Sequence, residues 1–290
     1  MLAEVPGQEG GVMILGRLRE RRNPGSVVGV LVKGGFVVLK AGKVVLGLAS
    51  FAVYAILFTW QFAVIILGML IIHEYGHLRC MKHYGMKTRG IYLIPLFGAA
   101  AVAEDNFPSR RAEATVALAG PLTGAMLAAG TGLVYVATRN GAFAAAAAWM
   151  ALINLFNLLP VVPLDGGRVV KSITCSIGSR TGLAALIAGM LLGAVLAVTA
   201  DLWIFAIIIP LGLLDYLYDR HQARRTGRST GKHARIQTGA GISAGKPPLS
   251  PRASQAAFAC HAVLAVLLWL FILAMGHQPG SAAAMHALQS

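Results

Sequence analysis

Two histidines and a glutamate, spaced for work on a metal ion, lie inside an apolar stretch of this sequence. The pentapeptide His73-Glu74-Tyr75-Gly76-His77 carries the pattern H-E-x-x-H. Residues four apart share one face of a helix, so His73 and His77 can present two imidazoles to one metal, with Glu74 beside them to take a proton from water. A chance match arises in roughly one chain of this length in a hundred, and an uncompensated Glu is costly in apolar sequence. The pattern therefore predicts a catalytic metal site.

A catalytic zinc ion needs a third protein ligand, and Asp165 is the candidate. It lies in the run from Asn157 to Arg168, which reads NLLPVVPLDGGR. Pro160 and Pro163 would break a helix, and the two glycines would let the backbone bend beside the carboxylate. Irregular backbone at membrane depth is tolerated where it faces protein or a water-filled cavity. The alternative is a solvated Asp in a turn at the membrane surface.

The composition of the chain is that of a membrane protein. Of its 290 residues, 57% are hydrophobic and 12% are charged, against roughly a quarter charged in soluble domains. We predict an all-α polytopic membrane protein with about six to seven transmembrane helices. The apolar segments that approach the length needed for a crossing are 43–59, 62–82, 114–137, 142–164, 182–199, 202–217 and 257–275.

The positions of Lys and Arg predict how the chain is oriented. Of the 25 basic residues, 24 lie in or at the ends of stretches that would all lie on one side of the membrane, and Arg139 alone falls on the other side. The N-terminus is therefore expected in the cytoplasm, and the net charge of +14 becomes an orientation signal. The basic stretch 220–252 is rich in Gly, Ser and Pro. It is interpreted as a cytosolic linker near anionic lipid, and no nucleic-acid partner is expected.

The orientation also brings the two motifs together. Segments 62–82 and 142–164 both run from the outside inward, so His73 and His77 lie roughly 8–14 Å deep from the cytoplasmic end of their helix at about 1.5 Å per residue. Asp165 lies at the cytoplasmic end of the other segment. The predicted site is therefore in the cytoplasmic half of the membrane.

HEYGH in one membrane helix, with NLLPVVPLDGG in the second helix after it, closely resembles the site-2 protease family of intramembrane metalloproteases. The resemblance covers about 60–170. It implies that His73, His77 and Asp165 bind one zinc ion per chain and that Glu74 is the catalytic base.

The same resemblance implies that Asn157 lies near the zinc, where its amide can stabilise the oxyanion of the tetrahedral intermediate. Asn154, one helical turn earlier, competes for this role from sequence alone. Family members have a β-hairpin at the place of Gly90–Val102, which reads as extended chain with a turn. Its open strand edge could pair with an unwound substrate segment, or the hairpin could be a re-entrant plug without substrate contact. Ala119–Gly124 resembles the family's A-G-P and predicts close helix packing without chemistry.

The implied activity is that of a zinc-dependent metalloendopeptidase that cuts within or near transmembrane segments, in regulated intramembrane proteolysis. Single-span membrane proteins are the expected substrates. A compact member of the family without PDZ or CBS domains is indicated, in the lipid bilayer of a bacterial inner membrane. The predicted division is a basic N-terminal region at 1–42, a metalloprotease domain at 43–218 with its core at 60–170, a flexible linker at 219–256 and a further helix with a tail at 257–290.

Other functions could use the same residues. A metal transporter or sensor could employ His73, His77 and Asp165, but Glu74 would then have no special task, and neither a polar path nor an inverted repeat is seen in the sequence. A catalytically silent relative is disfavoured because every core motif residue is intact. A prenyl-protein protease can also use H-E-x-x-H, but the motif from Asn157 onward argues against it.

Overall fold

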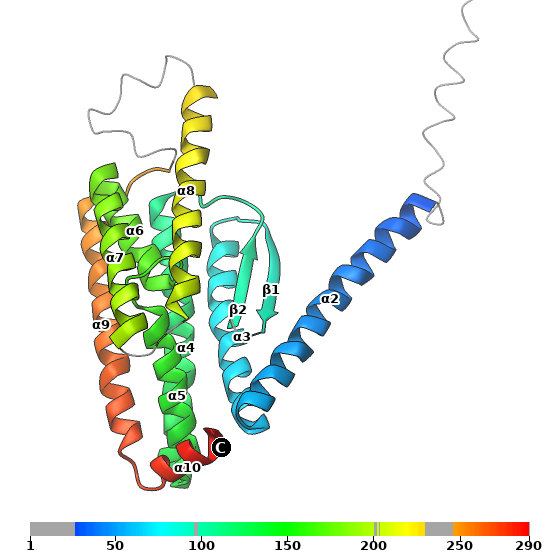
Figure 1. Cartoon of the computed structure of the whole chain (residues 1–290), viewed down its shortest axis with the longest axis vertical. Helices are drawn as coiled ribbons and strands as arrows, with labels where there is room; N and C mark the ends of the chain where they lie inside the picture. Colours follow the sequence, from blue (N-terminus) through cyan, green and yellow to red (C-terminus); the bar gives the residue numbers. More distant parts are fainter. Residues whose placement is uncertain (1–26, 96–97, 200–201, 203, 230–245, 290) are drawn as a thin grey trace, which may run out of the picture. The chain divides into compact units, whose positions relative to one another are not determined.

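The structure is a computed structural model that describes residues 27–95, 98–199, 202, 204–229 and 246–289 (Figure 1). The chain divides into two units, Met1–Leu46 and Gly47–Ser290. Helix α2 (Val27–Leu57) crosses the division. The elements that follow are α3 (Trp60–His83), β1 (Thr88–Ile94), β2 (Gly98–Ala103), α4 (Arg110–Thr138), α5 (Gly141–Asn157), α6 (Asp165–Ile177), α7 (Ser179–Thr199), α8 (Phe205–Ser229), α9 (Pro251–Gly276) and α10 (Ser281–Gln289).

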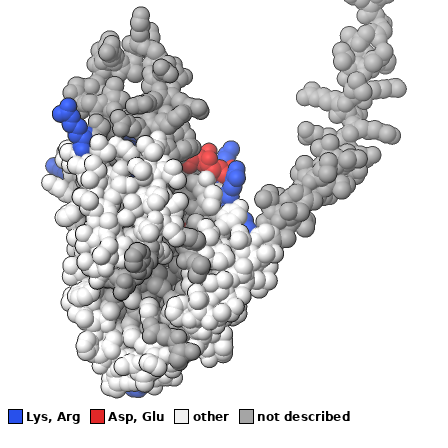
Figure 2. All heavy atoms as spheres, viewed as in Figure 1, with Lys and Arg blue, Asp and Glu red and all other residues white. Residues whose placement is uncertain are grey.

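Helices dominate the second unit, and their lengths fit a membrane. Among the described residues, four helices are long and apolar enough to cross a bilayer, namely α3, α4, α9 and the 180–199 part of α7. Shorter apolar helices cover 42–57, 141–157 and 205–217. On the face drawn in Figure 2, most of the surface of this unit is uncharged. The prediction of a helical, polytopic membrane protein is confirmed.

The predicted hairpin is present between α3 and α4. Strands β1 and β2 pair antiparallel, with Ile91 opposite Ala101 and Ile94 opposite Gly98. Gly98 opens the returning strand at a φ of +91°, which L side chains rarely adopt. Figure 1 shows the two strands alongside α3, which brings β2 close to the helix that carries the H-E-x-x-H pattern.

The segment predicted at 142–164 is broken where the prolines begin. Helix α5 ends at Asn157, and residues 158–164 form an irregular connection. A new short helix, α6, then starts at Asp165. The break was expected from the prolines, whereas α6 was not predicted. Helix α8 continues to Ser229 and α9 begins at Pro251, so helical residues extend into both ends of the range 219–256; the proposed domain boundaries stay predictions.

Close packing between α3 and α4 fixes the centre of the unit. A side chain at Gly76 of α3 would collide with the Ala119 carbonyl oxygen and the Thr123 hydroxyl of α4. Around this contact, Phe62, Met69 and other apolar residues of α3 are buried against α4, α5 and α9. Backbones that approach this closely place the side chains of α3 directly against α4, which is what the site requires.

Candidate metal centre

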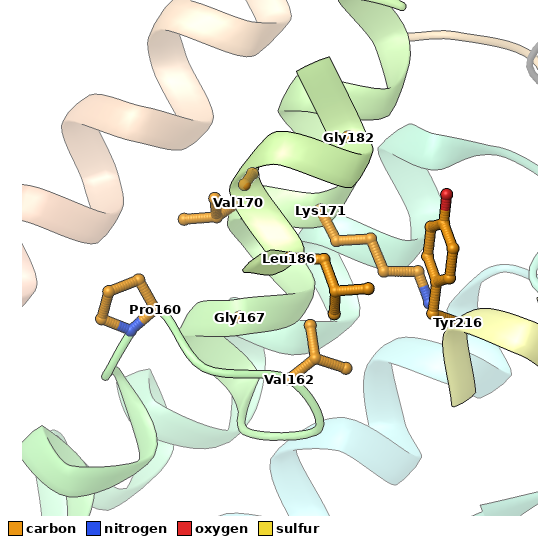
Figure 3. A pocket seen from close by; sticks show the side chains of 9 residues that line it. Pro160, Val162, Gly167, Val170, Lys171, Gly182, Leu186 and Tyr216 are labelled. Carbon is orange, nitrogen blue, oxygen red and sulfur yellow. The ribbon is translucent and has the colours of Figure 1, made fainter. Parts of the chain in front are cut away.

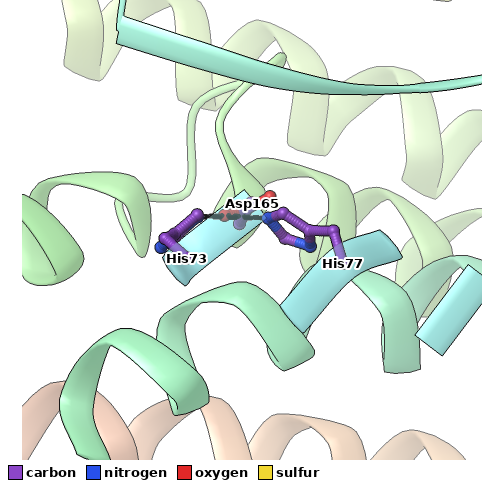
Figure 4. A group of neighbouring side chains, drawn as sticks. All are labelled: His73, His77 and Asp165. Carbon is purple, nitrogen blue, oxygen red and sulfur yellow. Dashed lines mark hydrogen bonds and ion pairs between the residues drawn. The ribbon is translucent and has the colours of Figure 1, made fainter. Parts of the chain in front are cut away.

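Three buried side chains from two separate parts of the sequence converge, two from α3 and one from α6 (Figure 4). The Nε2 atoms of His73 and His77 lie 3.0 and 3.2 Å from Oδ2 of Asp165. The two Nε2 atoms are 3.1 Å apart. The three residues are between 1% and 8% exposed. They form a group that could hold a metal ion, as the sequence predicted.

Hydrogen bonds on the far side of each imidazole fix where its proton is. Nδ1 of His77 is 2.7 Å from the Val116 carbonyl oxygen, which can only accept, so Nδ1 is the donor. Nδ1 of His73 is 2.9 Å from Oδ1 of Asn154. The Asn154 amide is itself oriented, because its Nδ2 donates to the Met150 carbonyl at 2.7 Å. His73 therefore also carries its proton on Nδ1.

This arrangement fits a divalent cation. In the neutral rings with both protons on Nδ1, the two Nε2 atoms carry lone pairs, and these atoms face each other and a carboxylate oxygen. Three such electron-rich atoms repel one another unless a positive charge lies among them. Two imidazole nitrogens with one carboxylate oxygen is a donor set typical of catalytic zinc. Outer hydrogen bonds from the far ring nitrogen are the usual way in which metal-binding imidazoles are oriented.

Glu74 is held by the hairpin. Its Oε2 accepts a hydrogen bond of 2.6 Å from the backbone N–H of Ala101 in β2. Because the Ala101 N–H donates to Glu74, this N–H points away from the partner strand β1. Glu74 is 8% exposed and follows His73 directly on α3. The hairpin thus orients the carboxylate that is next to the metal ligands.

Helix α4 passes so close to the imidazoles that only glycine fits. A Cβ at Gly120 would lie in contact with Nε2 of His77 and Nε2 of His73. A Cβ at Gly124 would collide with the side-chain amide of Asn154. The sequence predicted close packing of helices at Ala119–Gly124. The structure adds that the space left by these glycines is filled by the candidate ligands and by the residue that orients one of them.

The two asparagines differ in what they contact. Asn154 is fully buried and contacts His73. Asn157 ends α5 and is partly exposed. Within the described part of the chain, no hydrogen bond joins its side chain to His73, His77 or Asp165. The resemblance gave the oxyanion role to Asn157, with Asn154 as its competitor from sequence alone; the structure gives Asn154 a contact with the imidazole of His73.

Sequence reasoning missed the backbone contributors, Val116 and Ala101. Neither residue type carries a signal, because the contact is made by a carbonyl or an amide that every residue has. Asn154 did carry a signal, being a polar residue in apolar sequence, and its contact with His73 gives that signal a structural meaning.

Comparison with known proteins agrees with this geometry. The family model described as peptidase family M50 matches residues 61–140. The protein Rip3 of Mycobacterium tuberculosis is 31% identical over 173 residues, covering 50% of this chain and 44% of its own length. Zinc metalloprotease MJ0392 of Methanocaldococcus jannaschii is 29% identical over 174 residues, covering 52% and 48%. Stage IV sporulation protein FB of Bacillus subtilis is 25% identical over 172 residues, covering 54% and 58%. The chain spans about half the length of these relatives.

Proposed function

Residues 61–140 belong to peptidase family M50, and from this premise we propose that the protein is a zinc-dependent endopeptidase that cuts other membrane proteins within or near their transmembrane segments. The observation that carries the proposal is the convergence of three buried donor atoms within 3.2 Å, with both imidazole protons held on the far side. His73, His77 and Asp165 would hold one zinc ion per chain. When bound, the zinc supplies Lewis-acid polarisation of the scissile carbonyl and makes a water molecule more acidic.

Glu74 acts as the general base in this proposal. It is adjacent to His73 in sequence, buried, and held at one oxygen by the Ala101 amide. That hydrogen bond holds one oxygen of the carboxylate and leaves the other oxygen to accept a proton from water. The same carboxyl group then delivers the proton to the leaving amine.

Asn157 is the residue we propose for the oxyanion. Both polar ends of the Asn154 side chain are engaged, one with His73 and the other with Met150. Asn157 lies one turn further along α5 and next to the irregular connection that leads to Asp165. Its amide donors would stabilise negative charge that develops on the scissile carbonyl oxygen.

Strand β2 is the proposed docking site for the unwound substrate. A peptide bond inside a helix is shielded, since its carbonyl is already hydrogen-bonded, so the substrate must unwind before it is cut. Extended peptide can add to an open strand edge through backbone hydrogen bonds. The Ala101 amide of β2 is taken by Glu74, so this strand lies next to the proposed base, and the substrate would pair with other backbone groups of the hairpin. The sequence of β2, GAAAVA, offers only small side chains there.

Single-span membrane proteins are the substrates we propose, cleaved in regulated intramembrane proteolysis. A single helix that has unwound can enter between the helices of the bundle as an extended segment. A helix packed inside a polytopic protein is less free to unwind and enter in this way. The proposed location is a bacterial inner membrane with the N-terminus in the cytoplasm, which the distribution of Lys and Arg supports.

The test is cleavage of a panel of single-span substrates by the purified protein in liposomes, beside Glu74→Gln, with zinc content measured in both. We expect the wild type to cut. Glu74→Gln should bind about one zinc and lose at least about a hundredfold in rate, because only the proton transfer is removed.

Equal cleavage by the two proteins would refute the role of Glu74. The same liposomes test the alternative of a metal transporter. A transporter would carry zinc across the membrane equally well with and without Glu74→Gln, and it would cleave no substrate.

A further inference from the structure

A buried cluster of charges joins four segments of the bundle at a distance from the metal centre. Glu113 of α4 is 3% exposed and forms ion pairs with Arg110 at 2.8 Å, Lys246 at 3.3 Å and Lys171 at 3.7 Å. Lys171 of α6 also pairs with Asp215 of α8 at 2.6 Å. Such charges are rarely buried unless they are paired. The cluster is not used by the proposed reaction, so its position in the fold needs its own explanation.

The cluster joins α6 directly to α4, and the metal centre joins α6 to the imidazoles of α3 that lie against Gly120 of α4. On α4, Glu113 precedes Gly120 by seven residues, or about 10.5 Å, and the two lie on one helix face. On α6, Lys171 follows Asp165 by six residues, or about 9 Å. Asp165, near the start of α6, contacts the imidazoles, and Lys171, further along α6, pairs with Glu113 of α4. A shift of α6 along α4 would therefore break the ion pair between Lys171 and Glu113.

Helix α6 is a short helix whose first turn packs against the backbone of residues 158–162 at Gly166 and Gly167. It has only 13 residues, and the chain before it is irregular from residue 158 to residue 164. On the side toward α7 and α8 a small pocket lies against it, lined by Gly167, Lys171, Leu186 and Tyr216 among others (Figure 3). In that view the Lys171 side chain extends toward Tyr216 on α8. Through Lys171, α6 is also linked to Glu113 of α4 and to Asp215 of α8.

The segment before α9 closes the cluster from the other side. Besides the pair between Lys246 and Glu113, the Arg110 amide donates to the Pro247 carbonyl at 3.0 Å. The Leu249 amide donates to the Ser176 hydroxyl of α6 at 3.0 Å. Residues 246–249 therefore join the start of α4 to the last turn of α6.

We propose that Lys171 and Glu113 are positioning residues for the metal centre, whose ion pair fixes the height of α6 so that Asp165 meets His73 and His77. The inference rests on the proposed zinc site and extends it to residues outside the family motifs. Neither residue touches the metal or the substrate. The chemistry that depends on them is zinc affinity, since an aspartate displaced along the helix axis no longer reaches the ion that the imidazoles hold.

The experiment measures the zinc dissociation constant of the full-length protein in detergent by competition with a chelator, below the melting temperature of each metal-free variant. Lys171→Met should weaken zinc binding tenfold or more, by analogy with the loss of an outer-shell partner. Lys171→Arg, which keeps the charge, should stay within about threefold of the wild type. Arg89→Gln is the matched control, because its pair with Glu104 is exposed at 3.4 Å and far from α6 in sequence.

A second variant covers the case in which Lys171→Met does not fold with Glu113 left in place. Replacing both residues, Lys171→Gln with Glu113→Gln, removes one charge of each sign, so the net charge of the cluster is unchanged. Weaker zinc binding by this folded double variant supports the proposal. Zinc affinity equal to that of the wild type in either folded variant overturns the proposal. This holds even where the melting temperature has fallen, because the two residues would then contribute to stability alone. A wild type that binds no zinc would instead refute the proposed function itself.

Discussion

At the scale of single residues, the centre is built by assigning each imidazole nitrogen one task. The far nitrogen of His77 is held by a main-chain carbonyl, and that of His73 by the Asn154 amide. Each contact orients a ring and, in the neutral imidazole, leaves the lone pair on the inner nitrogen. A neutral imidazole that is already oriented binds a metal ion without first losing a proton and without having to order its side chain.

The two asparagines of α5 should separate metal binding from catalysis. Asn154→Ala removes the acceptor of the His73 proton, and zinc affinity should fall roughly tenfold to a hundredfold. Asn157→Ala should retain zinc and lose about a hundredfold or more in kcat if its amide stabilises the oxyanion. Zinc titration and single-turnover cleavage of both variants make the comparison. The reverse pattern, with zinc lost in Asn157→Ala alone, would exchange the two assignments.

At the scale of elements, the hairpin and α6 do the positioning. Strand β2 supplies the amide that holds Glu74, and α6 supplies Asp165 in its first turn. Neither element has a long apolar pattern of its own. Both are held in place by what they pack against.

Removing one backbone N–H tests the role of the hairpin. Ala101→Pro eliminates the donor to Glu74, so the carboxylate loses its fixed orientation, and kcat should fall about tenfold while zinc content stays at the wild-type level. Ala101→Gly is the control, since it changes the side chain and keeps the amide. The contact would have no catalytic role if the proline variant, with its hairpin intact by hydrogen exchange, cut as fast as the glycine variant.

The sequence predicted the motifs and their meeting, but only part of the scaffold. Hydrophobic length predicted the apolar helices, and the spacing of His73 and His77 predicted their shared face. Helix α6 was missed because Gly166 and Gly167 read as helix breakers. In the structure a Cβ at either position would collide with backbone of residues 158–162, so glycine is required by tertiary packing. The residue types near Asp165 carry no information about a loop that folds back onto the next helix, because that contact is tertiary.

At the scale of the whole molecule, charge distribution governs how the bundle is inserted. Nearly all Lys and Arg residues fall in stretches that the apolar segments place on one side. Arg139, at the C-cap of α4, is the basic residue that falls on the other side. In the proposed topology the metal centre lies nearer to the side that carries the basic residues.

Cysteine labelling measures this orientation. The natural cysteines Cys80, Cys175 and Cys260 are replaced, and single cysteines are introduced at Asn140 and at Gly85, which lie in turns at opposite ends of the bundle. In intact cells a membrane-impermeant thiol reagent should label the cysteine at position 140 and reach that at position 85 only after lysis. Labelling of position 85 in intact cells would invert the predicted topology.

The main-chain carbonyl that holds His77 makes the two ligands unequal targets for mutation. Any amino acid at position 116 still presents a carbonyl there, provided that the helix keeps its course. The partner of His73 is a side chain, and a single nucleotide change can delete it. The contact with His77 therefore does not depend on the side chain at position 116, whereas the contact with His73 needs the asparagine side chain at position 154.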